Sequence, residues 1–260
     1  METTDKLPIR EILEKVQSES GNQDLSGIEL EEKLAGALSE KHNRKCDKCS
    51  ERNKNWWCID DPDYQLEVTR VLCGLPPVKR TFNDFEERDK STAQALKVAE
   101  GFAGNPSGWV IFLGNPGTGK SHLAQGIAET IISREVGKQS APVRFINSAF
   151  LLDKLRASYS ATEESESFDR LFTSYCEHPI LILEDLGMES SSPYAIERLS
   201  MILDHRYAGR MPTILTSNLT PSGLREKLND RIADRVFDNG TGLVTSVVLN
   251  TSSYRTSRKG

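Results

Sequence analysis

Short apolar runs alternate with amphipathic stretches along the C-terminal two thirds of the chain. The apolar runs have the length of buried β-strands and lie at 109–113, 143–146, 180–183, 213–216 and 243–249. Between them, apolar residues three and four positions apart predict helices, which include 91–102, 121–137, 193–207 and 224–236. Strands that alternate with helices are typical of a doubly wound α/β fold with a parallel sheet.

The loop after the first strand carries the strongest chemical signal. Residues 114–121, GNPGTGKS, match the pattern G-x-x-x-x-G-K-[ST] between a strand and a helix. Glycines let backbone N–H groups turn toward phosphate oxygens, and the helix adds its positive dipole end. Lys120 is expected to neutralise β- and γ-phosphate charge and Ser121 to ligate Mg²⁺. The predicted nucleotide-binding residues are Gly114, Asn115, Pro116, Gly117, Thr118, Gly119, Lys120, Ser121 and His122.

Two carboxylates follow the apolar run 180–183 directly, where ligands sit in open α/β sheets. Hydrolysis of a nucleotide needs carboxylates that hold Mg²⁺ and orient water. By position, Glu184 is expected to serve Mg²⁺, and Asp185 to polarise the attacking water. Asn218 ends the next strand and is expected to orient that water or sense the γ-phosphate. The alternatives are a solvated acidic strand end and a simple turn asparagine.

The helix predicted at 224–236 carries Arg231 and Arg235, which are four residues apart and therefore lie on one face. An arginine that reaches a neighbouring subunit's γ-phosphate stabilises transition-state charge. We expect Arg235 to be this finger, with Arg231 as the second candidate. The alternative is a solvated basic face whose arginines pair with nearby acidic residues, Asp230, Asp234 or Glu226.

Four of the five cysteines precede the predicted nucleotide-binding domain. Cys46 and Cys49 form a C-x₂-C knuckle, and Cys58 and Cys73 complete a tetrahedral set for a structural Zn²⁺, with His42 as a possible substitute ligand. A redox dithiol or unliganded thiols are the alternatives. A thioredoxin-like motif is disfavoured because no βαβ pattern surrounds the C-x₂-C.

The polar N-terminal stretch 1–41 has weak helical patterning and predicts either a partner-binding arm or a loosely helical tail. Because 74–80 has the composition of a linker, we predict two domains, a helical and cysteine-rich module at 1–73 and a nucleotide-binding domain at 74–260.

The net charge of −5 argues against a surface coated for nucleic acid but leaves room for a local basic patch. The residues that could line such a groove are Arg144, Lys154, Arg156, Arg255, Arg258 and Lys259. The chain has neither an apolar secretory core at its start nor a run near the ~18 apolar residues of a membrane span, so we expect a cytoplasmic protein.

With these motifs, the chain resembles the AAA+ ATPases of the DnaC/DnaI helicase-loader type and their IstB relatives over residues 71–255. The matching segments are LCGLPPVKRTFNDF, GNPGTGKSHLA, LILEDLG, LDHRY, TILTSNL, DRIADRV and the closing SSYR. Several motifs in the right order are far more specific than the phosphate loop alone.

The resemblance implies a slow, partner-stimulated ATPase that binds a hexameric replicative helicase and helps place it on single-stranded DNA. It also implies zinc in the N-terminal module, no helical lid, and nucleotide held between subunits, so that ATP promotes self-assembly. One departure stands out, because such loaders usually have two aspartates where this chain has Glu184 and Asp185. The longer side chain is expected to move the metal or to slow hydrolysis.

Three other functions compete with the loader. An IstB-like ATPase would serve a transposase and duplex DNA instead of a helicase and single strands. An ATP-gated adaptor would work by assembly with little hydrolysis. In a third alternative, the cysteines would form a redox switch.

Overall fold

The computed structural model describes residues 62–136, 141–158, 168–189, 192–238 and 240–254. These residues contain one parallel sheet with the strand order β2-β3-β4-β1-β5. The strands are β1 (Trp109–Gly114), β2 (Val143–Asn147), β3 (Ile180–Glu184), β4 (Thr213–Ser217) and β5 (Val244–Leu249). The predicted doubly wound α/β fold is confirmed.

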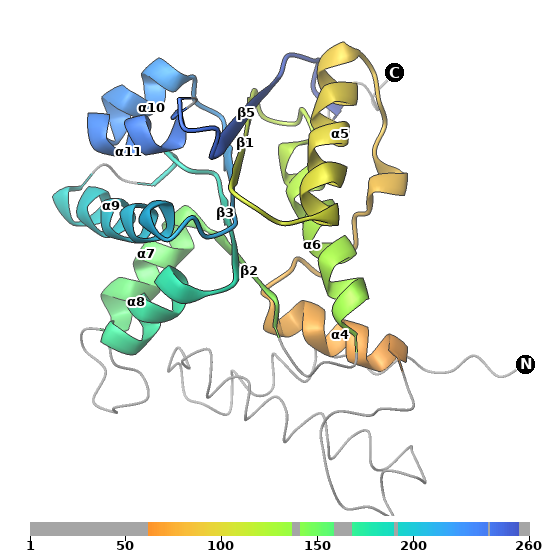
Figure 1. Ribbon diagram of the computed structural model, residues 1–260, viewed down its shortest axis with the longest axis horizontal. Helices are drawn as coiled ribbons and strands as arrows, with labels where there is room; N and C mark the ends of the chain where they lie inside the picture. The colour runs from red at the N-terminus through yellow and green to blue at the C-terminus, as the bar shows by residue number, and fades with distance from the viewer. Residues whose placement is uncertain (1–61, 137–140, 159–167, 190–191, 239, 255–260) are drawn as a thin grey trace, which may run out of the picture.

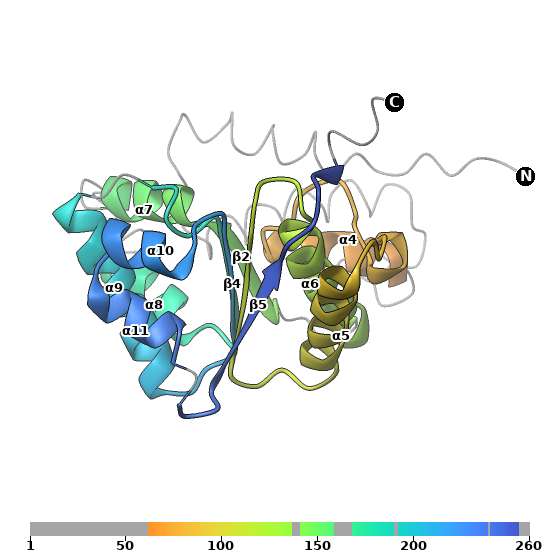
Figure 2. The same cartoon turned by 90° about the horizontal axis from the view of Figure 1, so that it is seen from above.

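Helices cover both faces of the sheet, which gives three layers (Figures 1 and 2). One face carries α4 (Pro62–Leu72), α5 (Lys90–Gly104) and α6 (Lys120–Glu135). The other carries α7 (Ser148–Ala157), α8 (Phe168–Glu177), α9 (Pro193–Ala208), α10 (Pro221–Lys227) and α11 (Asp230–Val236). A short 3₁₀ turn, η1 (Phe82–Asp84), precedes α5. No helix in the described ranges is long and apolar enough to span a membrane.

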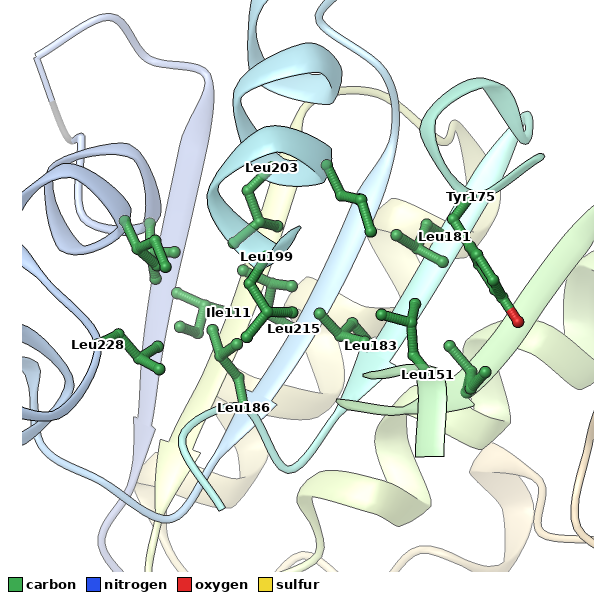
Figure 3. Close-up of a cluster of buried hydrophobic side chains, with 14 of the residues drawn as sticks. Ile111, Leu151, Tyr175, Leu181, Leu183, Leu186, Leu199, Leu203, Leu215 and Leu228 are labelled. Atoms are coloured by element: carbon green, nitrogen blue, oxygen red, sulfur yellow. The ribbon is translucent and has the colours of Figure 1, made fainter. Parts of the chain in front are cut away.

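Successive side chains of each strand point to opposite faces of the sheet, which divides the core into two clusters. Ile111, Leu183 and Leu215 point toward α7, α8 and α9, where they meet leucines such as Leu199 (Figure 3). Their strand neighbours face α5 and α6 in the second cluster, and these include Val110, Phe112, Ile182 and Ile214. A strand that is buried on both faces carries mostly apolar residues, which explains the predominantly apolar runs in the sequence.

Two local predictions are wrong in detail. The predicted helix 224–236 is two helices, because the Asn229 side chain accepts the backbone N–H of Ile232 at 2.7 Å and starts α11 anew. The sequence also predicts Ser148 as the cap of the helix that carries Leu151, Leu152 and Leu155. Asn147 caps α7 instead, since its side-chain oxygen accepts the N–H of Ala149 at 3.0 Å.

The helix α4 precedes the predicted domain boundary at residue 74 and packs on α6. Arg70 Nε lies 2.9 Å from Glu129 Oε1 on α6, and both side chains are almost fully buried. Cys73 is also buried, and its carbonyl accepts the N–H of Phe145 at 2.8 Å. The boundary stays a prediction. The predicted arm or tail at 1–41 and the cysteine-rich stretch up to residue 61 lie outside the described residues.

Arg206 on α9 is a fully buried arginine that ties α8 to β4. Its Nη1 donates to three carbonyls at the end of α8, the closest being His178 O at 2.8 Å. Nη2 donates to Pro212 O at 2.7 Å, and Nε donates to Thr213 Oγ1 at 2.9 Å. Because the last carbonyls of a helix have no partners within it, the guanidinium acts as the C-cap of α8.

We predict that Arg206→Met lowers the free energy of unfolding by more than about 2 kcal/mol, because several buried carbonyls lose their donor. Denaturant unfolding measures this change. The control is Arg156→Met, which removes an exposed arginine and should shift the value by no more than about 0.5 kcal/mol. Equal effects of the two substitutions would contradict the role of Arg206 as the C-cap of α8.

Candidate nucleotide-binding and hydrolysis site

The phosphate loop runs from the end of β1 to the first residue of α6. Gly114, Gly117 and Gly119 have φ angles of 147°, 82° and 101°, which side-chain-bearing residues rarely adopt. A Cβ on Gly119 would also lie 2.7 Å from the ring of Phe85. The loop is therefore built to expose its backbone, as the motif predicts.

Lys120 is folded onto the loop that it ends. Its Nζ donates to Gly114 O at 2.7 Å and to Asn115 O at 2.9 Å, and the residue is only 4% exposed. The ammonium group thus lies at the loop's own backbone, where phosphate oxygens would replace these carbonyls as acceptors. Thr118 braces the same turn through its hydroxyl, which donates to Asn115 O at 2.9 Å.

Glu184 ends β3 beside the start of α6, and its carboxylate is hydrogen-bonded to the Ser121 side chain. Burial, with a smaller contribution from the negative charge of Asp185, raises the pKa of Glu184 to about 7, against the lowering effects of Ser121, Arg80 and Lys120. Oε1 is buried and has no hydrogen-bond partner among the described residues. An unpartnered carboxylate oxygen next to a serine hydroxyl is a donor set that suits Mg²⁺.

Asp185 is held more rigidly than its neighbour. Its Oδ2 accepts from Asn147 Nδ2 at 3.2 Å, and its Oδ1 accepts from Asn218 Nδ2 at 3.4 Å. The backbone N–H donates to Thr216 Oγ1 at 3.0 Å. Its φ of 54° is a left-handed conformation that costs energy in a residue with a side chain. The fold thus fixes this carboxylate at the sheet edge.

Several residues that support Asp185 were not predicted from the sequence as site residues. Asn147 ends β2, and Ser148 Oγ donates to the Asp185 carbonyl at 3.1 Å and to Glu189 Oε2 at 2.6 Å. Glu189 is 4% exposed and also accepts the N–H of Gly187. The available signal was the polar residue that ends the run 143–146, since parallel strands bring their carboxyl ends to one edge.

His122 contacts the segment that precedes α5. Its Nε2 lies 2.8 Å from Thr81 O, and its ring meets that of Phe85 edge to face at 5.3 Å. Burial lowers the pKa of His122. Gln125 donates to Val78 O at 2.6 Å, so α6 holds the segment 78–85 through two side chains. His122 therefore anchors that segment, and its contact with a nucleotide stays a prediction.

The segment after β5 lies on the phosphate loop, and no sequence pattern indicated this contact. The backbone N–H of Tyr254 donates to Gly117 O at 2.9 Å. The Tyr254 hydroxyl bonds to Glu86 O, and the Arg88 guanidinium stacks 3.8 Å from the centre of its ring. The residues that follow β5 thus pack against the phosphate loop through Tyr254.

Arg231 and Arg235 lie on α11, which packs on α9 on the sheet face opposite α6 (Figure 1). Both pair with Asp204 of α9, and not with acidic residues of their own helix. Asp230 and Asp234 pair instead with Arg225, each at 2.9 Å. The candidate fingers are therefore on a different surface from their own phosphate loop, as an action on a neighbouring subunit would require.

The predicted zinc ligands cannot be placed together. Cys73 is buried, whereas Cys46, Cys49, Cys58 and His42 lie outside the described residues. Within the described part of the chain, no group of three or more His, Cys, Asp or Glu side chains is arranged to hold a metal. The four-cysteine zinc site stays a prediction.

The basic residues considered for a DNA groove have other contacts. Arg144 donates to Leu72 O at 3.4 Å, and Arg156 pairs with Asp153 at 3.2 Å. Lys154 lies 5.0 Å from the centre of the Phe150 ring, which is 54% exposed. Arg255, Arg258 and Lys259 lie outside the described residues.

The strand order, the phosphate loop and the acidic end of β3 define a P-loop ATP-binding protein of the AAA+ class. A family model described as "IstB-like ATP binding protein" matches residues 63–260. The chain belongs to this family, which confirms the resemblance drawn from its motifs.

Two relatives in Escherichia coli strain K12 match about three quarters of the chain. The uncharacterized protein YdaV is 29% identical over 198 residues, which are 74% of this chain and 77% of YdaV. The replicative helicase loader DnaC is 27% identical over 197 residues, which are 74% of this chain and 76% of DnaC.

Solved structures support the same fold. The crystal structure of the DnaC helicase loader superimposes with a TM-score of 0.55 at 21% identity and covers 65% of this chain and 96% of the other. The crystal structure of DnaI gives 0.51 at 20% identity, with 67% and 90% covered. At these identities the likeness shows the fold alone.

We predict that Glu184→Gln makes the nucleotide-free protein more stable than the wild type at pH 8, by up to roughly 3 kcal/mol. The folded state raises the pKa of Glu184 from 4.5 to about 7, so the stabilising contribution of the neutral carboxyl is present below pH 4.5 and is lost as pH rises through 7. Denaturant unfolding at pH 5 and pH 8 tests this, with the exposed Glu100→Gln as control. If the difference in unfolding free energy between Glu184→Gln and wild type did not depend on pH, the raised pKa of Glu184 would be contradicted.

Proposed function

We propose that this protein is a Mg²⁺-dependent ATPase that binds a hexameric replicative helicase and helps place it on single-stranded DNA. The observation that carries the hydrolytic part is the fixed position of Asp185, whose carboxylate is bonded to Asn147 and Asn218 at the sheet edge that holds the phosphate loop. The partner is argued separately, from the relatives.

The loop and the acidic strand end divide the work of binding. The glycine loop presents backbone N–H groups to phosphate oxygens, and Lys120 neutralises β- and γ-phosphate charge. Ser121 and Glu184 would hold Mg²⁺, which would neutralise charge between the β- and γ-phosphates. The unpartnered Oε1 of Glu184 and the adjoining Ser121 hydroxyl fit this role, because both are oxygen ligands of the kind that Mg²⁺ selects.

Asp185 is the group that we assign to water activation. Its two asparagine neighbours hold both carboxylate oxygens in place, so that little reorganisation is needed when the water is polarised. Asn218 is also placed to orient the water or to sense the γ-phosphate. The long and buried Glu184 favours slow turnover, since it must lose a proton to serve the metal at full charge.

The helicase partner is supported by the relatives. The name of the E. coli relative DnaC describes a replicative helicase loader, and the alignment covers 76% of that protein. On this proposal, residues 1–73 contact the helicase and carry a structural Zn²⁺ on Cys46, Cys49, Cys58 and Cys73. The Arg70–Glu129 pair then joins the end of this module to the helix that begins at the phosphate loop.

Self-assembly completes the proposed ATPase. Arg231 and Arg235 lie on α11, on the sheet face opposite α6, and this placement supports a finger arginine supplied by a neighbouring copy. Turnover would therefore depend on assembly, and ATP would promote assembly.

A second candidate is favoured by the matching family, whose description names IstB-like ATP-binding proteins. In that case the same ATPase would assist a transposase and prefer duplex DNA. The third candidate is an adaptor that assembles when it binds ATP and hydrolyses little of it. A measurement of ATP turnover distinguishes it from the other two candidates.

We predict that Asp185→Asn keeps ATP binding within about threefold but lowers turnover at least 100-fold, because the water loses its activating carboxylate. Fluorescent-nucleotide binding and phosphate release measure the two effects. Lys120→Ala is the binding-deficient reference, and Asp153→Asn, on an exposed carboxylate of α7, is the matched control. Unchanged turnover in Asp185→Asn would refute the assigned role.

We predict that the tagged full-length protein recovers the replicative helicase from host lysate with ATP, and that Lys120→Ala recovers much less. Mass spectrometry identifies the partner, and a parallel binding assay compares single-stranded with duplex DNA. Recovery of a transposase together with duplex preference would replace the loader with the transposition function. Stoichiometric zinc in freshly purified protein would count against a redox switch.

A further inference from the structure

Both candidate finger arginines share one carboxylate. Arg235 Nε lies 3.3 Å from Asp204 Oδ1, and Arg231 Nη2 pairs with Asp204 Oδ2. The Asp204 side chain is 19% exposed, whereas Arg235 and Arg231 are 41% and 67% exposed. A sheltered carboxylate on α9 thus holds two cations that remain accessible from outside.

The two arginines are not held equally. The Arg235 guanidinium also lies 4.9 Å from the centre of the Tyr207 ring, which provides a cation–π platform. Tyr207 is itself fixed, because its hydroxyl bonds to Asp238 and its ring meets Trp109 edge to face at 5.8 Å. Among the described residues, Arg231 pairs with Asp204 and has no aromatic platform of this kind.

We propose that Asp204 is a positioning residue that presets Arg235 for the γ-phosphate of ATP bound to a neighbouring copy of this chain. The contact to Asp204 uses Nε, so the two terminal nitrogens of Arg235 are left to face a phosphate in the bidentate way that guanidinium groups favour. This inference rests on the proposed assembly-dependent ATPase.

Arg231 has a different part in this arrangement. Asp204 also pairs with Arg231, so its sheltered carboxylate keeps a counter-ion while the terminal nitrogens of Arg235 face phosphate. Presetting matters because a free arginine side chain loses much rotamer freedom when it is fixed, and a small misplacement costs a large factor in rate.

Subunit mixing tests the proposal with full-length proteins. An acceptor variant, Arg235→Ala, keeps its own ATP site but lacks the finger. A donor variant, Asp185→Asn, supplies the finger but cannot hydrolyse ATP. Each alone should be nearly inactive, and a mixture should recover turnover, because donor arginines reach acceptor sites. Failure of the mixture to recover turnover would overturn the trans arginine of the proposed function, and this inference with it.

Asp204→Asn is then added either to the donor variant or to the acceptor variant. On the donor it should lower the recovered kcat roughly tenfold or more, with KM for ATP changed less than twofold, because only finger placement is lost. On the acceptor it should have no effect. Asp204→Glu on the donor should restore most of the rate, and donor Asp234→Asn, which breaks an exposed pair on the same helix, should change nothing.

The possible results separate the two levels of the claim. In one result, the mixture without an Asp204 substitution recovers turnover, and a donor with Asp204→Asn recovers just as much. That result would overturn the role of Asp204 and leave the trans arginine in place. Equal loss on donor and acceptor would mean that Asp204 is only structural, which also overturns the proposal. Loss on the donor alone supports it, because a folding defect would appear on both sides.

Discussion

The burial of both sheet faces is the constraint on which the rest of this protein depends. A strand covered by helices on two sides carries mostly apolar side chains, so most polar groups gather where the strands end. β1, β2, β3 and β4 therefore deliver a phosphate loop, an asparagine, two carboxylates and another asparagine to one edge. The site therefore forms at the ends of the strands, where the helices no longer bury both faces of the sheet.

At this edge of the sheet, two neighbouring carboxylates have different environments. Glu184 is buried, has one unpartnered oxygen and has a raised pKa, whereas Asp185 is bonded to two amides. The first environment suits a group that gains charge when a cation arrives, and the second suits a group kept in one position. Equivalent residue chemistry thus acquires different properties from burial and hydrogen bonding.

Contacts between distant segments tie this edge to the rest of the chain. Arg70, Gln125 and His122 join the region before α5 to α6, and Tyr254 places the end of the described chain on the phosphate loop. On the opposite face, Arg206 closes α8 against β4, and its neighbours Asp204 and Tyr207 hold the arginines of α11. The motif LDHRY is therefore mainly a packing and positioning motif.

The sequence by itself determined the strands, the phosphate loop, the acidic strand end and the family, because each depends on residues adjacent in the chain. It could not determine that Asn147 reaches Asp185, that Asn229 divides one predicted helix into two, or that Asp204 holds Arg235. Local periodicity cannot reveal these features, since each depends on which elements the tertiary structure brings together or on which of several polar side chains takes a cap. Only the folded packing of strands and helices decided them.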